Sequence, residues 1–106
     1  MSKVHELKIE KKYFDARLQG IKQYEIRLND RGFKVGDVLH LREIVPERKY
    51  TGREELCEVT MIHELPGDNF IPTVVLSTKR LLLSGWVEAG STWHSLDGNL
   101  IAPRLK

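Results

Sequence analysis

A period of two in the placement of apolar and polar residues most constrains the fold of this chain. Four segments alternate in this way: residues 3–9, 24–28, 38–44 and 53–64. Successive side chains of a strand point to opposite faces, so each segment predicts a strand with one face on a core. Residues 73–78 form a continuous apolar run of the length of a buried strand. We therefore expect a fold built mainly of strands.

One stretch, from Glu10 to Gln19, follows a helical period instead. Its apolar residues recur at spacings of four and three: Phe14, Leu18 and Ile21. The opposite face would point to water: Asp15, Arg17 and Gln19. Gly20 is placed to end the helix. One helix among closely spaced strands predicts an α+β, mostly β fold, in which a small, mostly antiparallel sheet curls or closes and the helix covers an open end.

The composition fits one globular domain. At 106 residues the chain can bury a core without disulfides or metals. The formal net charge is only +2, so any binding of anions must come from local clusters of basic residues. The single cysteine, Cys57, is expected in the core and excludes an internal disulfide. No apolar run reaches the length of about 18 residues that spans a membrane, and we expect a cytoplasmic protein without membrane contact.

Basic residues border the expected turns, and aromatic residues lie among them. The basic residues are Lys22, Arg27, Arg31, Lys34, Arg42, Arg48, Lys49 and Arg53, and the aromatic ones are Tyr24, Phe33 and Tyr50. Such residues can bind phosphates and stack on unpaired bases. The alternative is that these are solvated charges balanced by neighbouring carboxylates, and charge alone leaves both open.

The segment from Gly20 to Arg31 combines both signs of charge. On a strand, Glu25 and Arg27 would share one face. Lys22 beside Glu25 could be an ordinary ion pair, or a lysine and a carboxylate tuned for acid–base chemistry. The scattered histidines and Cys57 lack the spacing of a metal site, and no glycine-rich phosphate loop is present. We expect no metal and no cofactor.

Seven short segments occur in an order that matches a known family. They are HELK at 5–8, YFDARLQGIKQYEIR at 13–27, NDR at 29–31, VGD at 35–37, LRE at 41–43, YTGRE at 50–54 and EVT at 58–60. Together they resemble the ASCH superfamily, whose domains have a PUA-like β-barrel fold. The likeness is greatest to its small phage and bacterial members of uncharacterised function, and it covers about residues 4–79.

The resemblance implies a small PUA-like barrel of five or six strands with one covering N-terminal helix. Its cleft would be lined by the GxKxxExR segment: Gly20, Lys22, Glu25 and Arg27. We accordingly expect a barrel domain at residues 1–80 and a C-terminal extension at 81–106. Leu81–Leu83 could lengthen the last strand, and residues 92–102 look like a hairpin. The extension contains Trp86 and Trp93, and it would pack on the same domain or on a second copy.

Three functions remain open. The leading hypothesis is a non-catalytic module that binds RNA or a nucleotide-like ligand through Lys22, Tyr24, Glu25, Arg27, Arg31, Tyr50 and Arg53. The second is an amidohydrolase with Lys22 and Glu25 as catalytic residues, because a related branch removes the acetyl group of N4-acetylcytidine with a lysine, a threonine and a glutamate. Lys22 falls at the position of that lysine, but Glu25 stands at that of the threonine. The third is a phage-type protein-interaction module whose C-terminal tail binds a partner protein or a second copy of the chain as a homodimer.

Overall fold

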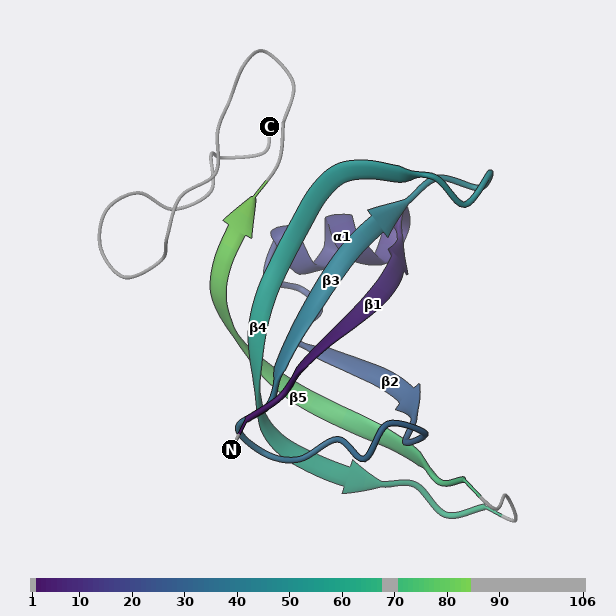
Figure 1. Ribbon diagram of the computed structural model, residues 1–106, viewed down its shortest axis with the longest axis vertical. Helices are drawn as coiled ribbons and strands as arrows, with labels where there is room; N and C mark the ends of the chain where they lie inside the picture. Colours follow the sequence, from purple (N-terminus) through teal and green to yellow (C-terminus); the bar gives the residue numbers. More distant parts are fainter. Residues whose placement is uncertain (1, 68–70, 85–106) are drawn as a thin grey trace.

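The computed structural model describes residues 2–67 and 71–84 (Figure 1). The elements of this part are β1 (Val4–Glu10), α1 (Lys11–Leu18), β2 (Tyr24–Leu28), β3 (Val38–Ile44), β4 (Tyr50–Glu64) and β5 (Thr73–Ser84). These five strands and one short helix confirm the expected α+β, mostly β fold. The strand predicted at residues 53–64 begins earlier, at Tyr50.

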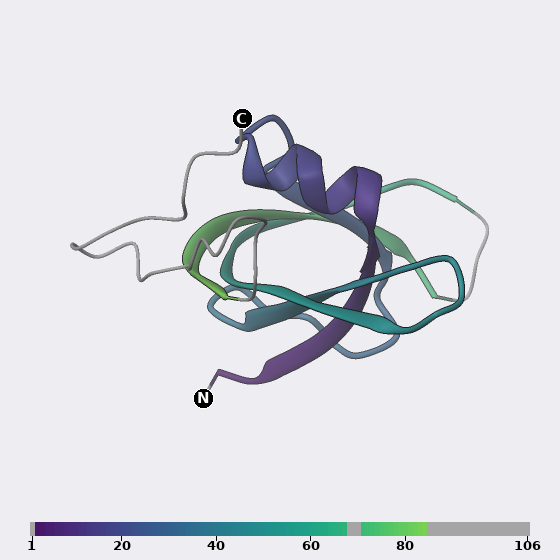
Figure 2. The same cartoon turned by 90° about the horizontal axis from the view of Figure 1, so that it is seen from above.

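The five strands form one sheet in the order β1-β3-β4-β5-β2. β1 and β3 are parallel, whereas the other neighbouring pairs are antiparallel. The long strands β4 and β5 bend strongly, so the sheet curls into a half-barrel, and α1 lies across its open side (Figure 2). The expected curled sheet with a covering helix is therefore present.

Bulges account for the bending of β4 and β5. Their register shifts between Leu56 and Cys57, where the extra residue is Leu81 of β5, and again between Val59 and Met61, where the extra residue is Thr60 of β4. An extra residue of this kind bends its strand and reverses the faces of the residues that follow. Strict alternation along residues 53–64 would place Met61 on the same side as Cys57 and Val59. Met61 instead lies beyond the bulge at Thr60 and is 58% exposed.

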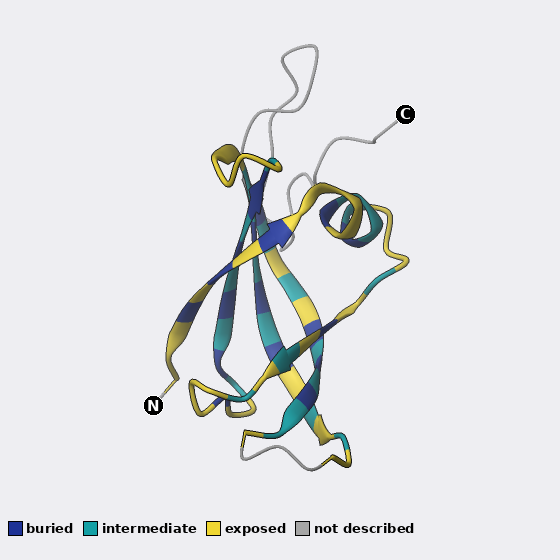
Figure 3. Ribbon diagram, turned by 90° about the vertical axis from the view of Figure 1, so that its right-hand side faces the viewer, coloured by how far each residue is buried: buried dark blue, intermediate teal, exposed yellow. Residues whose placement is uncertain are grey.

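The core lies inside the curl, where buried and exposed residues alternate along the strands (Figure 3). Its members come from the helix, the loop before β3 and four strands: Leu7, Ile9, Phe14, Phe33, Leu39, Leu41, Cys57, Val59, Val74 and Leu76. Cys57 is fully buried as expected, and burial raises the pKa of its thiol to about 12. The thiol is therefore a core side chain without nucleophilic character at neutral pH.

Two predictions about the helix were wrong. Arg17, expected to face water, is 2% exposed, and Ile21, expected in the apolar stripe, is 72% exposed. The helix ends at Leu18, and Gly20 takes the left-handed conformation expected of a terminating residue, with φ of 78°. Ile21 thus follows the helix and no longer shares its period. Arg17 is buried because carboxylates on two strands neutralise it.

Arginine side chains link the two outer strands of the sheet. Arg31 donates from Nη1 to the Glu6 carbonyl at 2.7 Å, and Arg27 donates from Nη2 to the Lys8 carbonyl at 3.0 Å. Both carbonyls belong to β1, and Arg27 belongs to β2. The N–H groups of these arginines thus bind carbonyls of β1 that the backbone N–H groups of a neighbouring strand would otherwise bind.

β5 runs to Ser84 and includes Leu81–Leu83. These residues therefore lengthen the last strand, which was one of the possibilities that the sequence left open. The hairpin predicted at residues 92–102 and both tryptophans lie outside the described residues. Within residues 2–67 and 71–84, no helix has the length and apolar character needed to cross a membrane.

Candidate functional site

Arg17 is the centre of a buried group of charged side chains. Its guanidinium has five N–H donors, and all five are used: two on Glu55, one on Glu25, one on the Thr78 hydroxyl and one on the Tyr24 carbonyl. Burial alone would lower the pKa of Arg17, but the hydrogen bonds and charge of Glu55 outweigh burial and raise it. Arg17 therefore remains charged and has no donor left for a ligand.

Glu25 lies at the junction of three cations. Its Oε1 accepts from Arg27 Nη2 at 2.9 Å and from Arg27 Nε at 3.3 Å. Its Oε2 accepts from Lys22 Nζ at 2.6 Å and from Arg17 Nη1 at 3.3 Å. A carboxylate offers about four lone-pair sites, so Glu25 is fully engaged. It holds the cations in place, and its hydrogen bonds to them occupy its acceptor sites.

Glu55 is the second carboxylate of the cluster and is fully buried. It accepts from Arg17 Nε at 2.6 Å, from Arg17 Nη2 at 3.0 Å and from Arg80 Nε at 3.1 Å. Arg80 also donates from Nη2 to the Arg17 carbonyl. Helix α1 and strands β2, β4 and β5 are thus joined by one network, and we call its charged members, Arg17, Lys22, Glu25, Arg27, Glu55 and Arg80, the ion cluster.

Local sequence explains how β2 supplies its share of the cluster. The left-handed Gly20 turns the chain after α1, and β2 follows from Tyr24. Its alternation turns Glu25 inward and leaves Ile26 53% exposed. The polarity of this strand is thus the reverse of the usual one, and its charged face is linked to the helix by the hydrogen bond from Arg17 to Glu25.

The ion cluster has a formal excess of positive charge. Four cations, Arg17, Lys22, Arg27 and Arg80, face two carboxylates, Glu25 and Glu55, which leaves an excess of two. A buried group with unbalanced charge attracts counter-ions strongly, since solvent screens it less than an exposed one. The site is therefore suited to an anion.

Two cavities adjoin the cluster. The first, of about 510 Å³, is lined by Lys8, Ile9, Glu10, Tyr13, Lys22, Tyr24, Glu25, Ile26 and Arg27. The second, of about 380 Å³, is lined by Arg17, Gly20, Lys22, Gln23, Glu55, Thr60, Thr78, Lys79 and Arg80. Lys22 lines both cavities, so a ligand in either one lies next to this residue.

Three cations of the cluster keep donors that no group in the described part of the chain accepts. Lys22 uses two of its three, on the Tyr24 carbonyl and Glu25. Arg27 donates only from Nε and Nη2, and Arg80 does the same. The Nη1 groups of both arginines remain. Each of these three residues lines at least one of the cavities.

Two tyrosines flank the ammonium group of Lys22 in the first cavity. Lys22 Nζ lies 4.9 Å from the centre of the Tyr24 ring and 5.6 Å from that of Tyr13. These are cation–π distances. The rings are 40% and 43% exposed, respectively. The first cavity thus combines cations with aromatic surface.

The structure brings together four of the seven residues proposed from the sequence: Lys22, Tyr24, Glu25 and Arg27 all line the first cavity. The expected same-face pair of Glu25 and Arg27 is confirmed. The other three, Arg31, Tyr50 and Arg53, line neither cavity. Arg31 binds the Glu6 carbonyl.

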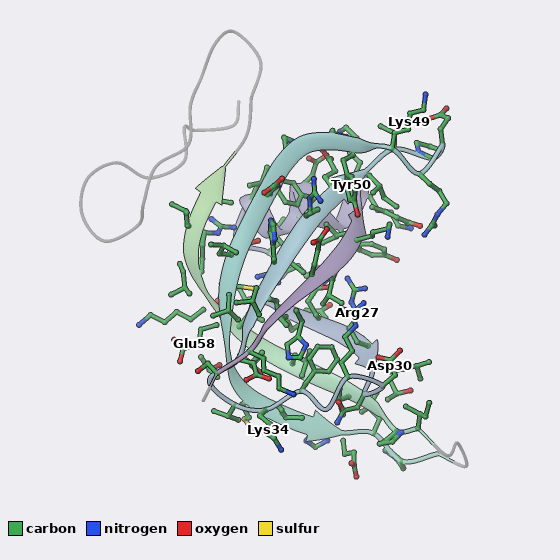
Figure 4. All side chains as sticks on the ribbon, in the orientation of Figure 1. Arg27, Asp30, Lys34, Lys49, Tyr50 and Glu58 are labelled. Atoms are coloured by element: carbon green, nitrogen blue, oxygen red, sulfur yellow. The ribbon has the colours of Figure 1, made fainter. Side chains whose placement is uncertain are left out.

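Tyr50 and Arg53 have partners of their own. Tyr50 lies away from Arg27 (Figure 4), and the guanidinium of Arg42 covers its ring at 3.7 Å. Arg53 binds Glu43 with Nε at 2.8 Å and Nη2 at 2.5 Å, and its Nη2 also binds Asp15 at 2.9 Å. Arg53 thus fastens α1 to β3.

Sequence reasoning missed Arg17, Glu55 and Arg80, the residues that build the interior of the cluster. One signal pointed to Glu55: in the alternation of β4 it falls on the same face as Cys57 and Val59, and all three are buried. A carboxylate on a core face requires a cation as partner. Nothing in the sequence indicated that this partner was Arg17, 38 residues away.

Comparison with known proteins identifies relatives without an assigned function. A protein-family model described as "Domain of unknown function (DUF3850)" matches residues 4–71. The chain is 42% identical over 65 residues to the "Uncharacterized 12.9 kDa protein in GpA 3'region" of Escherichia phage P2. That match covers 61% of this chain and 59% of the phage protein, so the chain spans less than two thirds of the relative's length. Thr78 and Arg80 lie beyond the part that the family model matches.

Proposed function

Because the chain belongs to the DUF3850 family of domains of unknown function, we propose its function from the ion cluster: it is a module that binds RNA or a nucleotide-like ligand. A phosphate of the ligand lies in the first cavity, where Lys22 and Arg27 donate to it. Glu25 orients both cations and does not contact the phosphate.

The observation that carries this proposal is the excess of two positive charges beside an open cavity. Arg27 offers its Nη1 donors and Lys22 its third N–H, and guanidinium and ammonium groups are the usual phosphate ligands of proteins. Because Glu25 already fixes both side chains, binding loses little side-chain entropy. Such preorganisation supports a binding role for the cavity.

The aromatic surface supports a nucleotide over a simple anion. Tyr13 and Tyr24 line the same cavity as Lys22 and Arg27, and partly exposed rings next to basic groups are typical of sites that stack unpaired bases. A base on either ring would lie within reach of a phosphate on the cations.

The fold supports assignment to the ASCH type. A curled sheet of five strands with a helix over its open side, within the described residues, agrees with the PUA-like barrel that the sequence resemblance implies. We infer that the chain is a small ASCH-like domain whose GxKxxExR segment, residues 20–27, lines the ligand cleft.

The state of Glu25 favours binding over hydrolysis. A general base needs a lone pair directed at the proton it removes, whereas Glu25 accepts hydrogen bonds from Arg17, Lys22 and Arg27 on its two oxygens. We therefore do not assign the acetylcytidine reaction to this cleft.

Titration of the wild-type protein with cytidine monophosphate and with a short oligouridylate at low salt tests the proposal. Affinity for both should fall as salt rises, and Arg27→Ala should weaken both by roughly tenfold or more, because a hydrogen bond to a charged group is lost. Lys49→Ala is the matched control, since Lys49 is exposed and lines neither cavity. If wild type binds neither probe, or if its binding ignores salt, the proposal is wrong.

A further inference from the structure

The second cavity adjoins the first at Lys22, and the proposed function leaves it without a role. We propose that it is a second phosphate subsite, and that the ligand is a single strand of nucleic acid that passes over Lys22 with one phosphate in each cavity. This inference rests on the proposed function of the first cavity and adds to it the class of ligand.

The charges that line the second cavity favour an anion. Lys22, Lys79 and Arg80 line it, and Lys79 is exposed. Its carboxylate, Glu55, is fully engaged by Arg17 and Arg80. An incoming phosphate therefore meets net positive charge and no unpaired carboxylate.

Hydrogen-bond donors are also available there. Arg80 keeps its Nη1 group, because its described bonds use Nε and Nη2. Arg80 is fixed by Glu55 and by the Arg17 carbonyl. The donors of this cavity are thus preorganised, as those of Arg27 are in the first cavity.

The arrangement of charge points to two phosphates. One formal excess charge would remain after a single phosphodiester is bound, because the cluster has four cations and two carboxylates. A phosphodiester in each cavity neutralises both, and Lys22, which lines both cavities, contacts the two in turn. Tyr13 and Tyr24 line only the first cavity, so a base stacks there while the strand continues as backbone past Arg80.

A single strand fits this arrangement better than a duplex. Stacking on Tyr13 or Tyr24 requires a base that is free of its partner. The cations contact backbone phosphates and read no base edge, so binding should depend on length and salt more than on sequence.

The test compares a short oligouridylate with uridine monophosphate on three variants. Lys79→Ala and Arg80→Ala should each lower the affinity for the oligonucleotide severalfold. Each should also make the slope of log affinity against log salt concentration shallower by about 0.7, the value for one phosphate contact on a single strand. Lys79→Ala should leave the affinity for the mononucleotide unchanged, because Lys79 lines only the second cavity and lies outside the ion cluster. Arg80→Ala removes one charge of the cluster, so it should weaken binding of the oligonucleotide more than binding of the mononucleotide. Arg27→Ala should weaken both ligands.

Lys34→Ala serves as the control, because Lys34 is exposed and lines neither cavity. Lys79 is exposed as well, so its variant will fold even if loss of Arg80 perturbs Glu55. Equal thermal unfolding of wild type and Lys79→Ala verifies this.

Each outcome is informative. If Lys79→Ala and Arg80→Ala bind the oligonucleotide like wild type while Arg27→Ala weakens both ligands, the second subsite is refuted and the proposed function stands. If uridine diphosphate binds as tightly as the oligonucleotide, and if Lys79→Ala and Arg80→Ala both lower its affinity, the two phosphates belong to one nucleotide. The proposal of a nucleic-acid strand as the ligand is then wrong. If wild type binds no ligand, both proposals are wrong.

Discussion

Arg17 and Glu55 form a two-pronged ion pair that joins α1 to β4, with Nε 2.6 Å from Oε1 and Nη2 3.0 Å from Oε2. Both side chains are shielded from solvent, at 2% and 0% exposure. A two-pronged arrangement fixes the orientation of the guanidinium as well as its distance. This pair holds the helix on the sheet next to the second cavity, which both residues line.

Arg17→Ala should lower the free energy of unfolding by about 3–5 kcal/mol, because it leaves two buried carboxylates short of a partner. Urea denaturation measures the loss. Lys11→Ala, which breaks the exposed i,i+4 pair with Asp15 on the same helix, should change stability by less than about 0.5 kcal/mol. A loss for Arg17→Ala as small as that of Lys11→Ala would contradict the structural role of the pair.

Arg53→Ala should lower stability without changing the affinity for a nucleotide. Arg53 fastens Glu43 and Asp15 and lies over the Phe14 ring at 4.9 Å, and it lines neither cavity. The buried Glu43 keeps only its hydrogen bond from Thr51, so a loss of roughly 2–3 kcal/mol is expected. Chemical denaturation and mononucleotide titration of the same preparation separate the two effects. Weaker nucleotide binding by a fully folded Arg53→Ala variant would show that Arg53 belongs to the ligand site.

Asp37 should make the free energy of unfolding depend on pH in the acidic range. Burial alone would raise the pKa of its carboxyl, but His5 at 2.8 Å and the backbone N–H groups of Lys3 and Lys34 hold the pKa below its ordinary value of 3.8. A lowered pKa in the folded state stabilises the protein above the unfolded pKa, and the gain is lost as pH falls through the folded value.

The comparison with Asp37→Asn isolates this contribution from other carboxylates. The difference in free energy of unfolding between wild type and variant should be largest near neutral pH and should shrink below about pH 4. Urea denaturation at a series of pH values measures it. A difference that stays constant across that range would show that Asp37 titrates alike in the folded and unfolded chain.

Gly20→Ala should cost about 1–2 kcal/mol of stability, the energy of a left-handed conformation in a residue with a Cβ. Gly20 has φ of 78°, and a Cβ there would meet no atom within 4 Å, so backbone strain is the only penalty. Gly67→Ala is the matched control, since a Cβ there also meets no atom within 4 Å and no left-handed φ is required. Thermal unfolding should separate the two variants, and equal melting temperatures would contradict the assigned strain.

Local pattern was sufficient for much of the fold. The strand predicted at residues 3–9 is observed at Val4–Glu10, and the terminating role of Gly20 was predicted correctly. The pairing of Glu25 with Arg27 on one face of β2 followed from the same period of two. These features depend on backbone geometry within a few residues, which is why the sequence alone determined them.

Only the tertiary structure decided which charged residues are buried. Arg17 looked like a solvent-facing helix residue, yet its partner Glu55 lies 38 residues away and Thr78 lies 61 residues away. The bulge at Thr60 in β4, beyond which Met61 is exposed, likewise depends on pairing with β5. A charge can leave water only where the folded chain brings an opposite charge to it. The period of a strand or helix specifies a face, but it does not specify what the rest of the chain places against that face.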